Sequence, residues 1–338
     1  MKKVSLKDIA QIAGVVPSTV SMVLNGKAKE NRISDAVAEK IMAIAKEVGY
    51  SPNQVAVSLR TGSSKIIGLI VEDISNIFYA TIASVIEDEL KSEGYRIVYC
   101  STKNDPVNGV ELINMLSQRQ VDGYIITPVE GMEDSLRNLK NQQKPVILID
   151  RFPPGLDISH VLVNDEKGII DGVNHLHERG YKNIGLITVD LGQVHMNYRE
   201  KAFKKYHADN GHPLKEELVL KIPYDLEVEG MIAMVCDFLS RSEELDALFF
   251  TTNYLCIIGL QALKRLNKNI PGDIAVLCFD DSDVFELYPP GISSIRQPVE
   301  EIGKRAVSLL MDCLDSPGNA ITVEHVLLPA TLIQRGST

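Results

Sequence analysis

The sequence predicts an α/β fold, and three observations carry that prediction. From residue 66 onwards, short apolar runs alternate with amphipathic stretches that have helical spacing. Repeated alternation of strands and helices is typical of parallel sheets with helices wound on both faces. The body beyond residue 65 is larger than one such sheet usually needs, so we expect two lobes. The first sixty residues differ, because they follow a helix, turn, helix, loop, helix pattern.

The strands expected in the body are short apolar runs at residues 66–71, 96–100, 123–126, 145–149, 183–187, 247–250 and 274–279. The helices expected between them include residues 81–93, 109–118, 166–178 and 254–266. Ligands of doubly wound sheets bind at the carboxyl ends of the strands. The sequence contains none of the glycine-rich phosphate motifs or the common hydrolase and metalloprotease motifs.

Composition excludes several classes of protein. With 45% hydrophobic and 24% charged residues in 338, the chain is neither disordered nor fibrous. No apolar run reaches the roughly 18 residues of a membrane helix, and the charged N-terminus does not resemble a signal peptide, so we expect a cytoplasmic protein. The five cysteines are odd in number and form no CxxC pair, which indicates free thiols and no zinc site.

Charge is distributed unevenly along the chain. The net charge is −10, but residues 1–60 hold nine Lys and Arg against five acids, a local charge of +4. The remaining residues carry −14. Such asymmetry predicts a partner for the first sixty residues that the rest of the chain avoids.

The first two predicted helices have clear boundaries. Ser5 with Asp8 resembles a capping box, and Gly14 ends the first helix. Pro17 fits the first turn of the second helix, which Asn25 and the following glycine end. Two short helices joined this way have the helix-turn-helix geometry, whose second helix enters a DNA major groove. The pattern alone is also compatible with a small three-helix bundle that has no partner.

The order of residues in this segment resembles the headpiece of the LacI/GalR family of bacterial transcription regulators. The similar segments are LxDIAxxAGV at 6–15, TVSxVLNG at 19–26, VGYxPN at 48–53 and AxxLR at 56–60. The loop at 25–34 resembles the fructose-repressor branch of the family. The body is also similar to the family's effector domain, at 73–79, 121–123, 149–151, 163–168, 179–184, 251–253, 279–281 and 295–298.

The resemblance implies a domain organisation. Residues 1–60 would form a DNA-binding headpiece with a hinge helix at 53–59, and residues 61–65 a linker. Residues 66–338 would form an effector-binding and dimerisation domain built like a periplasmic sugar-binding protein. Its N-subdomain would comprise about 66–162 and 297–323, and its C-subdomain about 163–294 and 324–338.

The resemblance also implies which residues contact DNA. They are Ser5, Pro17, Ser18, Thr19, Ser21, Met22, Asn25, Arg32, Asn53, Ala56 and Leu59. Members of the family usually have Ser at the position of Val16 and often have Arg at that of Met22. An arginine there reads guanine through two hydrogen bonds, whereas Met22 offers only apolar contact, for instance to a thymine methyl group. We therefore expect an operator half-site that differs from the family's commonest one.

Residues 53–59 are too few to form a stable helix alone. By resemblance, the hinge helices of two subunits fold on DNA and insert Leu59 into the minor groove, with Ala56 allowing close approach. Without the resemblance, a plain linker would be the simpler interpretation.

Polar residues at predicted strand ends are candidates for binding a small molecule. The resemblance assigns Asp150, Arg199, Asn253, Asp280 and Gln297 to the effector, and we add Asn76, Phe78 and Arg151. Such side chains donate to and accept from sugar hydroxyls. Arg151 together with Arg199 would suit a phosphate or carboxylate, as in the fructose-repressor branch, which responds to sugar phosphates.

The function that follows is a sequence-specific, effector-controlled transcriptional repressor of carbohydrate metabolism. Its partners would be double-stranded operator DNA, a sugar or sugar phosphate, and a second copy of the chain. A dimer rather than a tetramer is expected, because no heptad leucine segment follows residue 334. We expect no cofactor, metal or membrane partner, and we expect the seven histidines, His195 among them, to face solvent. The alternatives are a sugar-binding protein without regulatory DNA binding and, with less support, an enzyme of sugar metabolism.

Overall fold

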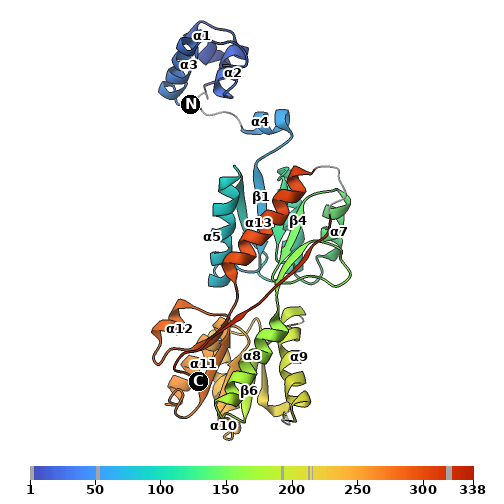
Figure 1. Cartoon of the computed structure of the whole chain (residues 1–338), viewed down its shortest axis with the longest axis vertical. Helices are drawn as coiled ribbons and strands as arrows, with labels where there is room; N and C mark the ends of the chain where they lie inside the picture. The colour runs from blue at the N-terminus through green and yellow to red at the C-terminus, as the bar shows by residue number, and fades with distance from the viewer. Residues whose placement is uncertain (1–3, 51–53, 192–193, 212–213, 215, 317–321) are drawn as a thin grey trace. The chain divides into compact units, whose positions relative to one another are not determined.

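The computed structural model describes the chain except for residues 1–3, 51–53, 192–193, 212–213, 215 and 317–321. The chain divides into two compact units, Met1–Ser64 and Lys65–Thr338 (Figure 1).

The first unit is helical. Its elements are α1 (Leu6–Ala13), α2 (Pro17–Leu24), α3 (Asp35–Glu47) and α4 (Gln54–Thr61). Ile9 of α1, Val20 of α2 and Ile41 of α3 are fully buried and form the centre of its core. One apolar stripe from each of the first three helices therefore holds the unit together.

Local capping sets the ends of α1 and α2. The predicted capping box is confirmed, because the Asp8 N–H donates to Ser5 Oγ and the Ser5 N–H donates to Asp8 Oδ2. Gly14 ends α1 with a φ of 73°, a conformation that glycine adopts without strain. Pro17 opens α2 after Val16, whose side chain makes no cap hydrogen bond.

The second unit contains two six-stranded sheets, and each sheet is the centre of one lobe. The first lobe has the strand order β11-β5-β4-β3-β1-β2, and all of its paired strands are parallel. Its strands are β1 (Ile66–Val71), β2 (Arg96–Ser101), β3 (Gly123–Ile126), β4 (Val146–Ile149), β5 (His160–Val163) and β11 (His325–Leu328).

The second lobe has the order β12-β10-β9-β8-β6-β7, and only its β10–β12 pair is antiparallel. Its strands are β6 (Ile184–Asp190), β7 (Val219–Pro223), β8 (Ala247–Phe250), β9 (Ala275–Phe279), β10 (Ser293–Arg296) and β12 (Thr331–Ile333).

Helices cover both faces of each sheet, as predicted for doubly wound sheets. In the first lobe, α5 (Ile77–Ser92) and α13 (Val299–Asp315) pack on one face, while α6 (Pro106–Gln118) and α7 (Glu133–Asn141) pack on the other. In the second lobe, α10 (Val228–Arg241) and α11 (Asn253–Arg265) lie opposite α8 (Asp165–Glu178) and α9 (Val194–Asp209). Helix α12 (Asp283–Leu287) follows β9.

One glycine allows a close helix–sheet approach. Gly259 of α11 lies against the Phe250 ring, and a Cβ there would overlap that ring. The absence of a side chain therefore lets α11 pack closely on β8.

The chain crosses between the lobes three times: from β5 to α8, from β10 to α13, and from β11 to β12 (Figure 1). The last crossing corrects the predicted boundary at residue 324. Strand β11 pairs with β5 in the first lobe, and only β12 belongs to the second. Each sheet has an edge at which a further strand can pair. The residue pattern of a strand as short as β11 does not indicate which of the two edges it joins.

The predicted runs at 66–71, 123–126 and 247–250 coincide with β1, β3 and β8. The sequence analysis missed β5, β7, β11 and β12. All four lie at or next to a sheet edge, where alternating polar residues weaken the apolar signal. All five cysteines are free thiols. None of the helices in the described part of the chain is long and apolar enough to cross a bilayer.

Candidate functional site

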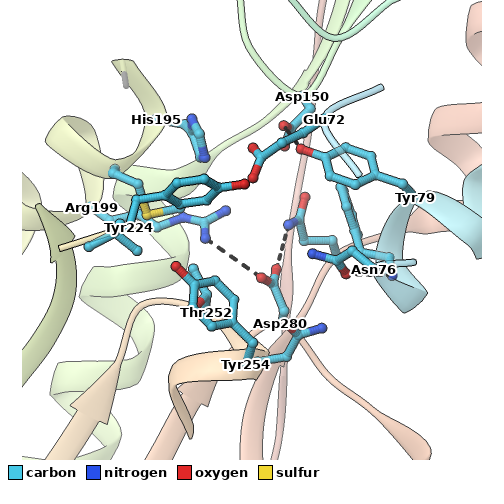
Figure 2. A pocket seen from close by; sticks show the side chains of 15 residues that line it. Glu72, Asn76, Tyr79, Asp150, His195, Arg199, Tyr224, Thr252, Tyr254 and Asp280 are labelled. Atoms are coloured by element: carbon cyan, nitrogen blue, oxygen red, sulfur yellow. Dashed lines mark hydrogen bonds and ion pairs between the residues drawn. The ribbon is translucent and has the colours of Figure 1, made fainter. Parts of the chain in front are cut away.

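A cavity of about 470 Å³ lies between the carboxyl ends of the strands of the two lobes (Figure 2). We call it the interlobe pocket. Of the eight residues expected to bind the effector, seven line it: Asn76, Phe78, Asp150, Arg199, Asn253, Asp280 and Gln297. Its location agrees with the rule that ligands of such sheets bind at the strand ends.

Each lobe contributes one aspartate in an uncommon backbone conformation. Asp150 directly follows β4 with a φ of 69°, and Asp280 directly follows β9 with a φ of 75°. Aspartate tolerates this left-handed region better than most residues. Backbone strain of this kind concentrates at functional sites, where the surrounding structure holds it in place.

Arg199 of α9 is the most heavily bonded side chain of the pocket. Its side chain is only 2% exposed. Its Nε donates to Asp165 Oδ1 at 2.8 Å, and its Nη1 donates to the Thr251 carbonyl at 2.7 Å. Nη1 also lies 3.8 Å from Asp280 Oδ2, and the guanidinium stacks 3.7 Å from the Phe279 ring centre. Nε and Nη1 of Arg199 are therefore directed at groups of the protein itself.

The two carboxylates beside Arg199 are deeply buried. Burial raises the pKa of Asp165 to about 6, although Arg199 opposes the shift. Burial likewise raises the pKa of Asp280, which accepts a 2.5 Å hydrogen bond from Gln297 Nε2. These shifts show that the pocket already holds negative charge at a cost in desolvation.

Arg151 is the one predicted residue that does not line the interlobe pocket. Its guanidinium donates to Glu72, to Asn104 Oδ1 at 3.2 Å and to the Tyr79 hydroxyl at 3.2 Å. Burial opposes the shift, but Tyr79 and the carboxylates of Asp150 and Glu72 raise the pKa of Arg151 above its ordinary value. Both guanidinium groups are paired with the protein's own carboxylates, and the joint binding of an anion by Arg151 and Arg199 stays a prediction.

The sequence analysis missed eight residues that line the pocket: Glu72, Tyr79, Val189, His195, Met196, Tyr224, Thr252 and Tyr254. The strand-end rule would have found Glu72, which directly follows the predicted run at 66–71, whereas Tyr224 follows β7, a strand that was not predicted. The aromatic rings of Tyr224 and Tyr254 come from the second lobe, and that of Tyr79 from the first (Figure 2).

His195 is a second correction, because it is 6% exposed rather than solvent-facing. Burial, together with Arg151 and Arg199, lowers its pKa well below 6.5, so the ring is neutral at pH 7. Its Nδ1 is buried and has no hydrogen-bond partner among the described residues. His160, His175 and His207 are buried as well. Within the described ranges, no three His, Cys, Asp or Glu residues are placed to hold a metal ion.

The residues expected to contact DNA gather on α2 and its flanks. Pro17 and Ser18 are exposed, while Thr19, Ser21 and Met22 are half-buried. Asn25 donates to the Ser21 carbonyl at 2.6 Å and accepts from Arg60 of α4 at 3.4 Å.

The remaining predicted DNA contacts are distributed more widely. Ser5 caps α1, and Arg32 is exposed in the loop before α3 with a φ of 53°. Asn53 lies outside the described residues. Ala56 and Leu59 belong to the backbone of α4, and their side chains are not described.

Comparison with known proteins decides the family. Residues 5–53 match the family of bacterial regulatory proteins of the lacI type, and residues 173–338 match a periplasmic binding protein-like domain. The probable HTH-type transcriptional regulator EndR of Paenibacillus polymyxa is 30% identical over 92% of this chain and 91% of its own. The chain belongs to the LacI family of bacterial transcriptional regulators.

Two solved structures extend the comparison. The lac repressor dimer bound to operator and the anti-inducer ONPF shares the fold, with a TM-score of 0.86 and 22% identity over 100% of this chain and 99% of that one. A periplasmic binding protein/LacI transcriptional regulator from Alkaliphilus metalliredigens QYMF, complexed with D-xylulofuranose, is 25% identical over 81% of this chain and 99% of that one, with a TM-score of 0.70.

Membership in the LacI family makes this chain a DNA-binding regulator and not an enzyme. The helical first unit is its headpiece, and the two-lobed second unit is its effector domain.

Removing the Arg199 guanidinium should reduce stability in a pH-dependent way. Arg199→Ala leaves Asp165 and Asp280 buried without their cation, which we expect to cost about 3–5 kcal/mol at pH 7. The pKa values of both carboxyls would rise further above their unfolded values. Protonation then favours the folded state, so the loss should shrink as pH falls from 7 to 5.

Urea unfolding of the full chain at the two pH values measures the effect. Arg241→Ala is the matched control, because Arg241 makes an exposed ion pair with Asp237 one helical turn away. An equal loss for both variants, or a loss that does not depend on pH, would contradict the assignment of Arg199 as the partner of both carboxylates.

Proposed function

We propose that this LacI-family regulator is a homodimeric repressor whose affinity for operator DNA is set by an uncharged sugar in the interlobe pocket. The observation that carries the proposal is the pairing inside that pocket. Its polar side chains come from both lobes, and Arg199, the arginine that lines it, is already paired with carboxylates. The site is therefore suited to a ligand that has many hydroxyl groups and no anionic group.

The polar lining suits a sugar. Asp150, Asn253 and Gln297 supply fixed donors and acceptors at the strand ends, and the rings of Phe78, Tyr224 and Tyr254 supply flat apolar surface. The similar regulator from Alkaliphilus metalliredigens QYMF, solved with D-xylulofuranose, supports a sugar as the effector class.

The charge balance supports a neutral sugar over a sugar phosphate. Around the pocket, Glu72, Asp150, Asp165 and Asp280 outnumber the two arginines. A phosphate group would meet surplus negative charge, and it would have to compete with bonded carboxylates for each guanidinium. The loop at 25–34 resembles that of the fructose-repressor branch. In this proposal the resemblance concerns the headpiece alone and not the effector.

A thermal-shift panel on the full chain tests the effector class. We expect a neutral mono- or disaccharide at 100 times its Kd to stabilise the protein by about 2.7 kcal/mol, while its phosphate ester has a smaller effect. The matched control for each sugar is its own phosphate ester at equal ionic strength. A phosphate ester that binds more tightly than its parent sugar would overturn the choice of an uncharged effector.

The proposed DNA contacts centre on α2. Helices that enter the major groove read bases through residues near their N-terminus, and phosphate contacts fix their register. The first sixty residues carry +4, so a dimer presents two basic headpieces to a duplex and its affinity should fall with salt. This role also implies a cytoplasmic location.

Met22 offers a test of direct readout. On operator sequences selected from random DNA with the full chain, Met22→Ala should weaken binding by about fivefold, or about 1 kcal/mol, through loss of an apolar base contact. Fluorescence anisotropy measures the change. Met42→Ala is the control, since Met42 is 54% exposed on α3 of the same headpiece. Unchanged affinity of Met22→Ala would remove Met22 from the proposed interface.

Exposed apolar side chains point to the dimer face. Leu287 and Val284 of α12 are 80% and 50% exposed, and Ile77 at the start of α5 is 56% exposed. Ile77 and Val284 line one shared cleft together with Ile257 of α11. Apolar groups gathered in this way are typical of a surface that a partner covers. A second copy is the partner we propose, because a two-fold dimer matches the two half-sites of an operator.

Leu287→Glu should therefore shift the chain from dimer to monomer. A charge placed in an apolar interface is costly to desolvate, and a monomer presents one headpiece instead of two. Light scattering at micromolar concentration measures the mass, and anisotropy measures operator binding. Val107→Glu, at an apolar residue of α6 that is 65% exposed, is the control. A dimeric Leu287→Glu variant would place the interface elsewhere.

Coupling between sugar and operator would pass through residues 53–61. The sugar contacts both lobes, so it favours one interlobe arrangement over others. In a dimer, that arrangement sets the spacing of the two chains that lead into the α4 helices. The effect must be reciprocal: the factor by which operator changes sugar affinity equals the factor by which sugar changes operator affinity.

A further inference from the structure

A second cavity, of about 630 Å³, adjoins the interlobe pocket. We call it the adjoining cavity. It lies beside the connections between the lobes: Phe152 follows β4, Leu162 and Val163 precede the crossing into α8, and Leu327 belongs to β11 just before the last crossing. Asp150 and His195 line both cavities.

The walls of the adjoining cavity are largely apolar and partly preformed. Leu327 is 59% exposed and Tyr198 is 47% exposed, so both leave apolar surface in contact with water. The Phe152 ring stacks on His160 with a centroid distance of 4.7 Å, and His160 stacks on His325 at 4.3 Å. This stack fixes an aromatic wall against which a flat apolar ring can pack.

The charged groups of the cavity are already committed. Arg151 is bonded to Glu72, Asn104 and Tyr79, Asp165 is bonded to Arg199, and Glu166 pairs with Lys205. Among the described lining residues, no cation lacks a carboxylate partner. An anionic ligand would gain no counter-charge and would face Asp150, Asp165 and Glu166. The cavity therefore favours an uncharged ligand.

His195 supplies the polar group that such a ligand would meet. The ring is neutral, and its buried Nδ1 has no partner in the described part of the chain. An unmet hydrogen bond of a buried group costs about 1–3 kcal/mol, which a ligand hydroxyl or N–H can recover. In Figure 2 the ring stands at the edge of the interlobe pocket, and His195 lines both cavities. A bond from a ligand in the adjoining cavity to the buried Nδ1 requires a rotation of the ring about its side-chain bonds.

We propose that the adjoining cavity is a second ligand site, which takes a small uncharged molecule with an apolar ring and one hydroxyl or N–H donor. The ring packs between Phe152, Leu162 and Leu327, and the donor bonds to His195. His195 lines both cavities, so a ligand that turns its ring toward the adjoining cavity turns it away from the interlobe pocket, and occupancy of this site lowers the affinity of the interlobe pocket for its own ligand. The existence of the site is independent of the proposed sugar effector; only the coupling rests on it.

Phenol is the probe that isolates these features, and benzoate is its anionic counterpart. Saturation-transfer NMR on the full chain should show phenol binding with a Kd on the order of 1 mM, as expected for seven heavy atoms, and much weaker binding of benzoate. With methyl-labelled Leu and Val, phenol should give contacts to the methyl groups of Leu162, Val163 and Leu327. Phenol contacts confined to other methyl groups, or equal binding of benzoate, would overturn the proposal.

Two variants test the walls and the polar group separately. Leu327→Trp fills the cavity from an exposed strand position and should abolish phenol binding, whereas Val107→Trp on α6 should leave it unchanged. His195→Phe keeps the ring and removes both nitrogens, so phenol affinity should fall about tenfold through loss of one hydrogen bond. If a variant does not fold, the contacts between phenol and the methyl groups of the unaltered chain still test whether the site exists. Retained binding in a folded Leu327→Trp would contradict the site.

The coupling has its own measurement. Titration of the sugar that gives the largest thermal shift, with and without saturating phenol, should show a sugar Kd at least about threefold higher in its presence, and phenol affinity must fall by the same factor. Independent binding would overturn the coupling and leave the site standing. Failure of every sugar to bind, with phenol contacts intact, would count against the proposed effector and not against the adjoining cavity.

Discussion

The effector domain depends on one chain of buried polar contacts: Asp165 to Arg199, Arg199 to Asp280, and Asp280 to Gln297. Asp165 begins α8 directly after the first crossing between the lobes, and Gln297 stands in the second crossing, directly after β10. The chain of contacts therefore ties two of the three connections to the second lobe's strand ends. A buried ion pair adds little net stability compared with well-packed apolar groups, but its geometry is strict. Its main effect is to hold both crossings in a defined arrangement around the interlobe pocket.

The first lobe repeats the arrangement with other residues. Arg151 joins the end of β1 through Glu72, α5 through Tyr79 and the end of β4 through Asp150. Tyr79 in turn donates to Asp150 at 2.8 Å. Each lobe thus presents an aspartate in the left-handed region of backbone conformation, held beside a guanidinium that the protein itself neutralises. The two halves of the pocket are preorganised separately, so a ligand that spans them needs to fix only the arrangement of the lobes.

Local patterns in the sequence were sufficient for the fold class, most central strands and the residues at strand ends. Strands such as β3 and β8 are buried on both faces, so they read as continuous apolar runs. The order of strands and the sheet that β11 joins depend on pairing between distant segments, which no local pattern records. The same limit applied to the arginines. Arg151 and Glu72 lie 79 positions apart, so the residue types suggested an anion site but could not show that Arg151 is paired with a carboxylate of the protein. His195 was misjudged because histidine is common on surfaces and in cores alike.

The short link between β11 and β12 has a mechanical consequence. Only Pro329 and Ala330 separate Leu328, in the first sheet, from Thr331, in the second. Three peptide units extend over at most about 11 Å, so the two sheets cannot draw apart along this edge unless one of the two strands detaches. Motion of one lobe relative to the other is thereby restricted to rotation about this short connection, which acts as a hinge. Such a constraint turns a small difference in ligand shape into a defined angle instead of an arbitrary displacement.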